Sequence, residues 1–189
     1  MSADGMTGAR ADAIELLTEQ HREVEQLWRM LEVGRSTETG QKIVEALSRH
    51  DAIETQLLYP ELREAGGEEG KELSAHSLDE HKQVRELLTR VDGKDFGDDA
   101  VFATMRECVE AVMHHVQEEE STIFPLLRSV CDEPRLMDLG TRMAEMHRMA
   151  PTHPHPHTPD SKVGATVAGA VSAVVDRARD AMREASDRG

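Results

Sequence analysis

Apolar residues recur every three or four positions along four long stretches of this 189-residue chain. This spacing places them on one face of a helix, because residues three and four apart lie above one another there. The stretches cover residues 11–32, 39–65, 69–91 and 98–130, and a shorter fifth covers 134–149. Glycines and an Asp-Gly pair punctuate the gaps, as helix ends and turns require. The pattern predicts an all-α fold, an up-down-up-down four-helix bundle with a short fifth helix.

The composition of the sequence changes after the fifth stretch. Pro and His alternate in residues 151–162, which predicts an extended linker because Pro fixes φ and lacks an N–H donor. Residues 163–187 have an amphipathic pattern and predict a C-terminal helix, which could dock on the bundle, join a second subunit into an oligomer, or remain a loosely tethered tail. The expected organisation is a bundle at 11–130, an additional helix at 131–150, the linker and the C-terminal helix.

Composition narrows the classes of partner. The formal net charge is −15, from 22 basic and 37 acidic residues, so we expect neither nucleic acid nor an anionic membrane surface as a partner. Aromatic residues make up only 3%, which disfavours an all-β fold. The two cysteines provide no disulfide framework, no signal peptide is visible, and the weakly polar run 163–175 is too short to cross a bilayer. We expect a cytoplasmic protein.

One motif occurs twice in the chain. A histidine is followed by Glu at +4, Pro at +10 and Leu at +12, and the second copy lies 65 residues after the first. The pairs of equivalent residues are His50 and His115, Glu54 and Glu119, and Pro60 and Pro125. A second similarity links HREVEQLW, which begins at His21, to HKQVRELL, which begins at His81. The bundle is therefore predicted to consist of two helix hairpins of one design.

The repeated polar residues fall inside the apolar stripes. Each of the four long helices is expected to direct one histidine into the core, and the second and fourth add a carboxylate. The six candidate metal ligands are His21, His50, Glu54, His81, His115 and Glu119. An unpaired buried carboxylate is destabilising by several kcal/mol, so the set requires a balancing cation. Iron, manganese and zinc all accept imidazole and carboxylate ligands, and two carboxylates on opposite helices can bridge two metal ions. Core histidines hydrogen-bonded to glutamates without a metal are the alternative.

These residues resemble the hemerythrin-like (HHE cation-binding) family. Its pattern of His, His-x-x-x-Glu, His and His-x-x-x-Glu on successive helices reads here as His21, His50-x-x-x-Glu54, His81 and His115-x-x-x-Glu119, and the resemblance covers residues 11–130. It implies a non-haem centre of two iron ions joined by an oxo or hydroxo bridge. The two glutamates would be bridging ligands and the four histidines terminal ligands. A ferritin-like centre is the weaker reading, because that motif is Glu-x-x-His with four carboxylates.

The chain departs from the oxygen-carrying members at one position. Those proteins have a His-x-x-x-His pair on the third helix, whereas Ser77 stands four residues before His81 here. His147 could supply the missing ligand, but a packing or surface role is favoured. Tyr59 could donate a hydrogen bond or ligate if its helix distorts, but packing at the helix shoulder is favoured.

The functional hypothesis is binding of dioxygen or a related small oxidant, for sensing, storage or detoxification. An enzyme that consumes peroxide or nitric oxide and a metal-stabilised interaction module are the alternatives. The partner is expected to be dioxygen, peroxide or another small molecule. No catalytic residue is assigned.

The remaining candidates are expected to lie outside the centre. His76 and His114 fall off the stripes and predict surface or flanking positions, and Cys108 predicts an apolar core filler. No specific site is expected in the flexible tail, whose histidines are His153, His155 and His157.

The prolines of the two motif copies are expected to deform their helices. Pro60 and Pro125 each remove one backbone hydrogen bond and should kink or end the helix. Leu58 and Ile123, each four residues after a motif glutamate, are expected to wall the pocket.

Overall fold

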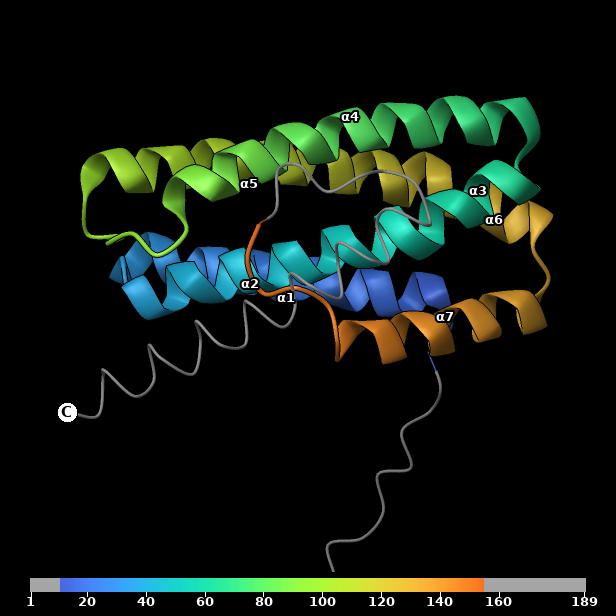
Figure 1. Cartoon of the computed structure of the whole chain (residues 1–189), viewed down its shortest axis with the longest axis horizontal. Coiled ribbons are helices and arrows are strands. Elements are labelled where there is room, and N and C mark those ends of the chain that lie inside the picture. Colours follow the sequence, from blue (N-terminus) through green and yellow to red (C-terminus); the bar gives the residue numbers. More distant parts are fainter. Residues whose placement is uncertain (1–10, 155–189) are drawn as a thin grey trace, which may run out of the picture.

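The structure, a computed structural model, describes residues 11–154. Its helical segments follow one another with short connections (Figure 1). In chain order they are α1 (Ala13–Gly34), α2 (Thr37–Ile53), the π-turn η1 (Glu54–Leu58), α3 (Tyr59–Ala65), α4 (Gly67–Val91), α5 (Asp99–Glu118), the π-turn η2 (Glu119–Ile123), α6 (Phe124–Val130) and α7 (Glu133–His147). The predicted C-terminal helix, residues 163–187, lies outside the described residues.

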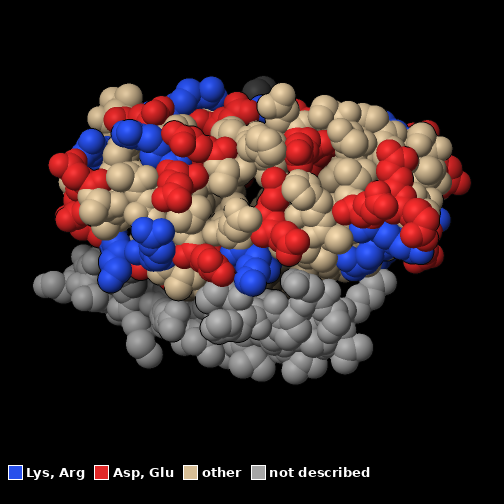
Figure 2. All heavy atoms as spheres, turned by 90° about the horizontal axis from the view of Figure 1, so that it is seen from above, with Lys and Arg blue, Asp and Glu red and all other residues tan. Residues whose placement is uncertain are grey.

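The architecture is the predicted all-α bundle of two hairpins. Helix α1 packs against α2, and α4 packs against α5, while α3 and α6 continue α2 and α5 beyond the π-turns. Helix α7 lies along α1 and α2 on the outside of the bundle (Figure 1). Acidic side chains are spread over the face of α4 and α5, with basic side chains among them (Figure 2).

Local sequence signals fix where the helices begin and end. Asp12 caps α1, accepting from the Glu15 N–H at 2.9 Å, and the Glu15 carboxylate accepts from the Asp12 N–H at 3.1 Å. The α1–α2 turn differs from the expected glycine turn, because Arg35 and not Gly34 has the left-handed conformation, with φ 45°. Gly93, after α4, has φ 68°, which a residue with a side chain adopts at a cost.

The second and fourth predicted helices are each interrupted by a π-turn. The Tyr59 N–H bonds to the Glu54 carbonyl, and the Phe124 N–H bonds to the Glu119 carbonyl, five residues back in both cases. Each proline then occupies the first turn of a new α-helix, where a missing N–H matters least. Helices α2 and α5 therefore end seven residues before their prolines, at Ile53 and Glu118, and the chain is helical again through Pro60 and Pro125. Each π-turn adds one residue to a helical turn without ending the helical path, so a new α-helix can begin directly after it within the bundle.

The apolar core is divided into two parts. One cluster lies at the end formed by α3, α6 and α7 and includes Leu17, Leu58 and Ile123, while the other includes Val24, Leu47 and Val112. On α1, His21 lies between Leu17 of the first cluster and Val24 of the second. The polar residues of the centre therefore occupy a layer between two apolar regions, which limits the access of water.

Candidate metal centre

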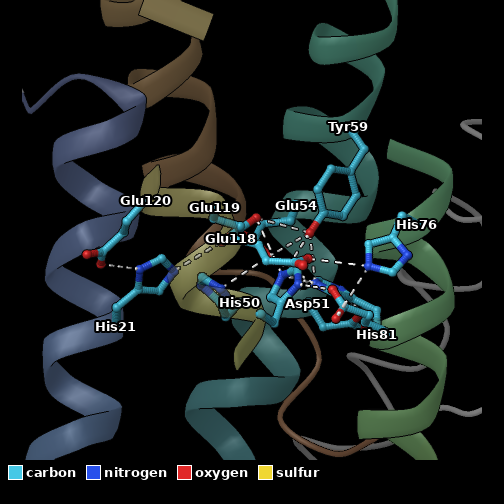
Figure 3. Close-up of polar contacts among 12 residues, drawn as sticks. His21, His50, Asp51, Glu54, Tyr59, His76, His81, Glu118, Glu119 and Glu120 are labelled. Atoms are coloured by element: carbon cyan, nitrogen blue, oxygen red, sulfur yellow. Dashed lines mark hydrogen bonds and ion pairs between the residues drawn. The ribbon is translucent and has the colours of Figure 1, made fainter. Parts of the chain in front are cut away.

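The six predicted ligands meet in the layer between the two apolar clusters. Glu54 and Glu119 are completely buried, and the four histidines are each less than 10% exposed. Each histidine Nε2 lies beside a glutamate oxygen, as Figure 3 shows for His21, His50 and His81. The Nε2-to-oxygen distances are 3.3 Å for His21–Glu119, 3.1 Å for His50–Glu54, 3.3 Å for His81–Glu54 and 3.5 Å for His115–Glu119.

These atoms form two overlapping groups of candidate ligands. The first group is His21, His50, Glu54 and Glu119, and the second is Glu54, His81 and His115. Within each group the ligand atoms all lie within 4.8 Å of one another. Glu54 belongs to both groups, so its carboxylate is placed to bridge two ions. Each group draws on both hairpins, so the centre would tie the two halves of the bundle together.

Each histidine is also held from the other side of its ring. All four Nδ1 atoms lie within hydrogen-bond distance of a side-chain oxygen. The pairs are His21–Glu120 at 3.0 Å, His50–Gln20 at 2.9 Å, His81–Asp51 at 2.8 Å and His115–Glu80 at 2.8 Å. A carboxylate or amide oxygen only accepts, so a neutral ring donates through Nδ1 and keeps a lone pair on Nε2. Metal-binding histidines in proteins are oriented in this way.

Tyr59 lies in the centre, so the preference for packing at the helix shoulder is wrong. Its hydroxyl oxygen is 2.8 Å from His81 Nε2 and 3.2 Å from His115 Nε2, and it donates towards Glu119 Oε1 at 3.2 Å (Figure 3). Tyr59 is the first residue after η1, and the π-turn turns its side chain inward. The hydroxyl is thus placed to complete the second ligand group.

Tyr59 also explains how the bundle accommodates Ser77. Ser77 is buried with 2% exposure, and its hydroxyl interacts with Tyr59. A small side chain on α4 leaves room for the phenol, which reaches the centre from the neighbouring α3. His147 is half-buried near Arg49 at the end of α7 and belongs to neither ligand group.

The electrostatics of the centre favour positive charge. Burial opposes charging of His115, but the carboxylates of Glu119, Glu80 and Glu54 together outweigh it and raise the pKa of His115 to about 11. Burial and the Glu119 charge both raise the pKa of Glu54, but His50 and His81 outweigh them and lower it. For Glu119, burial is likewise overcome by His115, and the pKa falls well below its usual value. Protons on the imidazoles therefore balance the carboxylates, and a metal cation would replace them.

Several buried polar atoms of the centre have no hydrogen-bond partner among the described residues. They are His21 Nε2, Glu54 Oε1 and Glu119 Oε2. His21 Nε2 and Glu119 Oε2 lie 3.3 Å apart as an ion pair, without the geometry of a hydrogen bond to each other or to another described residue. Unpartnered buried polar atoms are costly, whereas a cation satisfies them without hydrogen-bond geometry. The nitrogen and oxygen donors fit iron, manganese or zinc.

Three candidates lie outside the centre, as the sequence predicts. His76 and His114 are exposed, and Cys108 is buried in the second apolar cluster. His76 Nε2 is 3.3 Å from Glu118, and with Glu80 these residues form a surface group outside the buried centre.

His153 differs from the prediction of a flexible tail. It is only 6% exposed, and its Nδ1 lies 2.9 Å from both Asp92 oxygens. His155 and His157 lie outside the described residues.

Sequence reasoning missed the residues that orient the ligands. Asp51 accepts from His81 and from Arg85, whose Nη1 lies 2.7 Å away, and this network crosses from α2 to α4. Periodicity does not reveal such a link, because Asp51 is off the apolar stripe of its own helix. The signal for Tyr59 was available, since the motif repeat aligns it with the aromatic Phe124.

Membrane insertion finds no support in the described part of the chain. None of the helices within residues 11–154 combines the length and the apolar character needed to span a bilayer.

Comparison with known proteins agrees with this geometry. The family described as "Hemerythrin HHE cation binding domain" matches residues 12–127. An uncharacterized hemerythrin-like protein of Schizosaccharomyces pombe is 26% identical over 174 residues, which is 90% of this chain and 86% of that protein. The crystal structure of a hemerythrin HHE cation binding domain-containing protein from Mycobacterium kansasii superposes with a TM-score of 0.62 at 24% identity, covering 73% of this chain and 86% of the other. The family match spans more than half of the sequence, and the chain belongs to the hemerythrin HHE cation-binding domain family.

Proposed function

We propose that this chain binds two iron ions in the buried centre and uses them in the cytoplasm to bind or consume a small oxidant such as dioxygen, peroxide or nitric oxide. The observation that carries the proposal is the pair of ligand groups that share Glu54. Both groups contain buried carboxylate and imidazole donors, and three of their atoms have no hydrogen-bond partner among the described residues.

Different residues of the chain would have different roles in the centre. The four histidines and two glutamates hold the ions, and Glu54 is the common ligand. The oxygens of Gln20, Asp51, Glu80 and Glu120 fix the imidazole orientations. The apolar clusters on both sides exclude bulk water. Iron held in this way would supply electrons to, or withdraw them from, a small molecule at a coordination position that the protein leaves open.

Tyr59 favours consumption of an oxidant over reversible carriage. Its hydroxyl stands between the two histidines of the second ligand group and both carboxylates. In that place it can donate a hydrogen bond or a proton to a molecule at the centre, or contribute its oxygen as a ligand.

The test is the metal content and visible spectrum of aerobically purified protein, before and after azide and peroxide. Two irons per chain with absorption bands that shift on azide addition would support the proposal. Glu54→Gln, which removes the shared charge, should lose the bands, and His147→Ala should retain them. A colourless protein that takes up only zinc after anaerobic iron loading would contradict the proposal and favour a metal-stabilised interaction module.

A further inference from the structure

A small cavity adjoins the centre on the side formed by α2 and α4. Its volume is about 40 Å³, and the ligand histidines His50, His81 and His115 are part of its lining. Apolar side chains form much of its wall, including Leu47 and Leu88. The cavity therefore lies within reach of both ligand groups, and we call it the α2–α4 chamber.

Two hydroxyl groups of the chamber lack hydrogen-bond partners among residues 11–154. Ser48 and Thr55 line it, each is only 5% exposed, and neither Ser48 Oγ nor Thr55 Oγ1 makes a hydrogen bond within the described part of the chain. Buried hydroxyls are nearly always paired in folded proteins, with protein atoms or with an enclosed small molecule. The two hydroxyls therefore indicate that the chamber receives a molecule that hydrogen-bonds.

The size of the chamber limits what that molecule can be. A single water needs roughly 10–15 Å³ on the same measure of volume. The chamber thus has room for about three or four water-sized heavy atoms, which favours a very small molecule. A molecule of this size with donors and acceptors, such as hydrogen peroxide or a water pair, fits both the volume and the two hydroxyls.

The chamber has a counterpart at the repeat-equivalent positions, a more open pocket lined by Met113 and Glu120. In the repeat, Ser48 corresponds to Met113 and Thr55 corresponds to Glu120. Met113 is larger than Ser48 and packs against the second apolar cluster, and Glu120 Oε1 lies 3.0 Å from His21 Nδ1. The two halves of the repeat therefore differ at the positions where a small molecule would bind.

The segment after α7 forms the outer wall of the chamber. Pro151, His153 and Pro154 line it, and this segment crosses α2 towards α4 (Figure 1). The contact between His153 and Asp92 fixes the segment to the end of α4, and Asp92 also accepts from Gln41 Nε2 at 2.9 Å. The segment is thus attached at a point where a local rearrangement would uncover the chamber.

We propose that the α2–α4 chamber is the binding site for the small hydrogen-bonding ligand of the centre, with Ser48 and Thr55 as its docking groups and residues 151–154 as its gate. The proposal rests on the proposed function for the use of the ligand. The ligand is a very small molecule that accepts or donates hydrogen bonds, and it reaches the centre past His50 and His81.

The first test is the rate of azide association with the iron-loaded full-length protein, measured by stopped-flow absorption. Ser48→Met places in the chamber the side chain that the second half already carries, and it should slow association at least tenfold. His153→Ala should speed association at least threefold. Ser129→Met, at an exposed position of α6, is the matched control and should leave the rate unchanged. An unchanged rate in Ser48→Met with full iron content would overturn the proposal.

The second test does not depend on iron chemistry. A crystal structure of the zinc-loaded protein should show an ordered small molecule hydrogen-bonded to Ser48 Oγ or Thr55 Oγ1, and Thr55→Val should remove it. An empty chamber in the zinc-loaded wild type would contradict the proposal. If the wild type binds no metal at all, the proposed function fails, and the chamber proposal is then judged by the same electron density in the metal-free crystal.

Discussion

Tyr59 and Phe124 occupy equivalent positions in the two halves of the bundle, and each packs its ring against a ligand histidine of the opposite half. The ring centroids are 5.3 Å apart for Tyr59 and His81 and 5.8 Å apart for Phe124 and His21. Only Tyr59 adds a hydroxyl, so the centre has near-symmetric ligands and an asymmetric polar contact. A repeated scaffold can in this way have two metal positions with different chemistry.

Replacing Tyr59 by Phe should weaken one metal position more than the other. The variant keeps the ring against His81 but removes the hydroxyl that contacts four ligand side chains. Loss of such a contact typically weakens metal affinity by about 10- to 100-fold. Competition with a chelator should show one weakened site and one unchanged site. Thr104→Val, which removes a hydroxyl on the outside of α5, is the control, and equal affinity of Tyr59→Phe and wild type would rule out a role for the phenol.

Removal of a ligand that both groups share should lower the metal content more than removal of a ligand of one group. Glu54 belongs to both ligand groups, whereas His81 belongs only to the second. Glu54→Gln should therefore lose both metal ions, and His81→Ala should retain about half of the metal. Metal analysis after gel filtration measures this difference, and His114→Ala, at an exposed position, should bind as the wild type does. Equal losses in the two variants would mean that Glu54 does not bridge.

Asp51→Asn should lower metal affinity, although Asp51 is not itself a metal ligand. The Asp51 carboxylate accepts from His81 Nδ1 at 2.8 Å and from Arg85 Nη1 at 2.7 Å. An amide is a weaker acceptor and can present its NH₂ group to the imidazole, so the ring loses its orientation. We expect a loss of about 10-fold or more in affinity. Asp138→Asn, at a 72% exposed carboxylate on α7, is the matched control. Identical affinities would mean that the packing of His81 suffices to orient it.

A rise in pH should lower the melting temperature of the metal-free protein and increase the stabilisation that metal binding provides. Burial opposes charging of His115, yet the nearby carboxylates, chiefly that of Glu119, raise its pKa to about 11, above the usual 6.5. The protonated ring therefore stabilises the metal-free fold fully below pH 6.5, and this contribution is lost as the pH rises towards 11. The melting temperature of the metal-free protein should fall between pH 6.5 and 9. Metal ions bind the deprotonated rings, so the gain in melting temperature on loading should grow over the same range.

Calorimetry in two buffers of different ionisation enthalpy gives a check on that explanation. Loading at pH 7 should release protons from the imidazoles, and the observed heat should depend on the buffer. A metal-free melting temperature that rises between pH 6.5 and 9 would contradict the assigned charge state of His115.

The parts of this molecule that periodicity governs could be predicted from the sequence. Helical spacing places His21 between Leu17 and Val24, and the structure buries it there. Tyr59 could not be placed in this way, because a π-turn shifts its register by one residue relative to a regular helix. The contact between His153 and Asp92 could not be predicted either, since nothing in a Pro/His segment indicates which residues it packs against.

The π-turns have a consequence for how occupancy of the centre can be detected. Glu54 and Glu119 each offer a side chain to the centre and a carbonyl to the amide of Tyr59 or Phe124. A cation that fixes these glutamates also protects those two amides from hydrogen exchange with solvent, because local opening would have to break the metal bonds. The exchange rates at two backbone positions thus report metal occupancy, and they do so for zinc, which has no colour, as well as for iron.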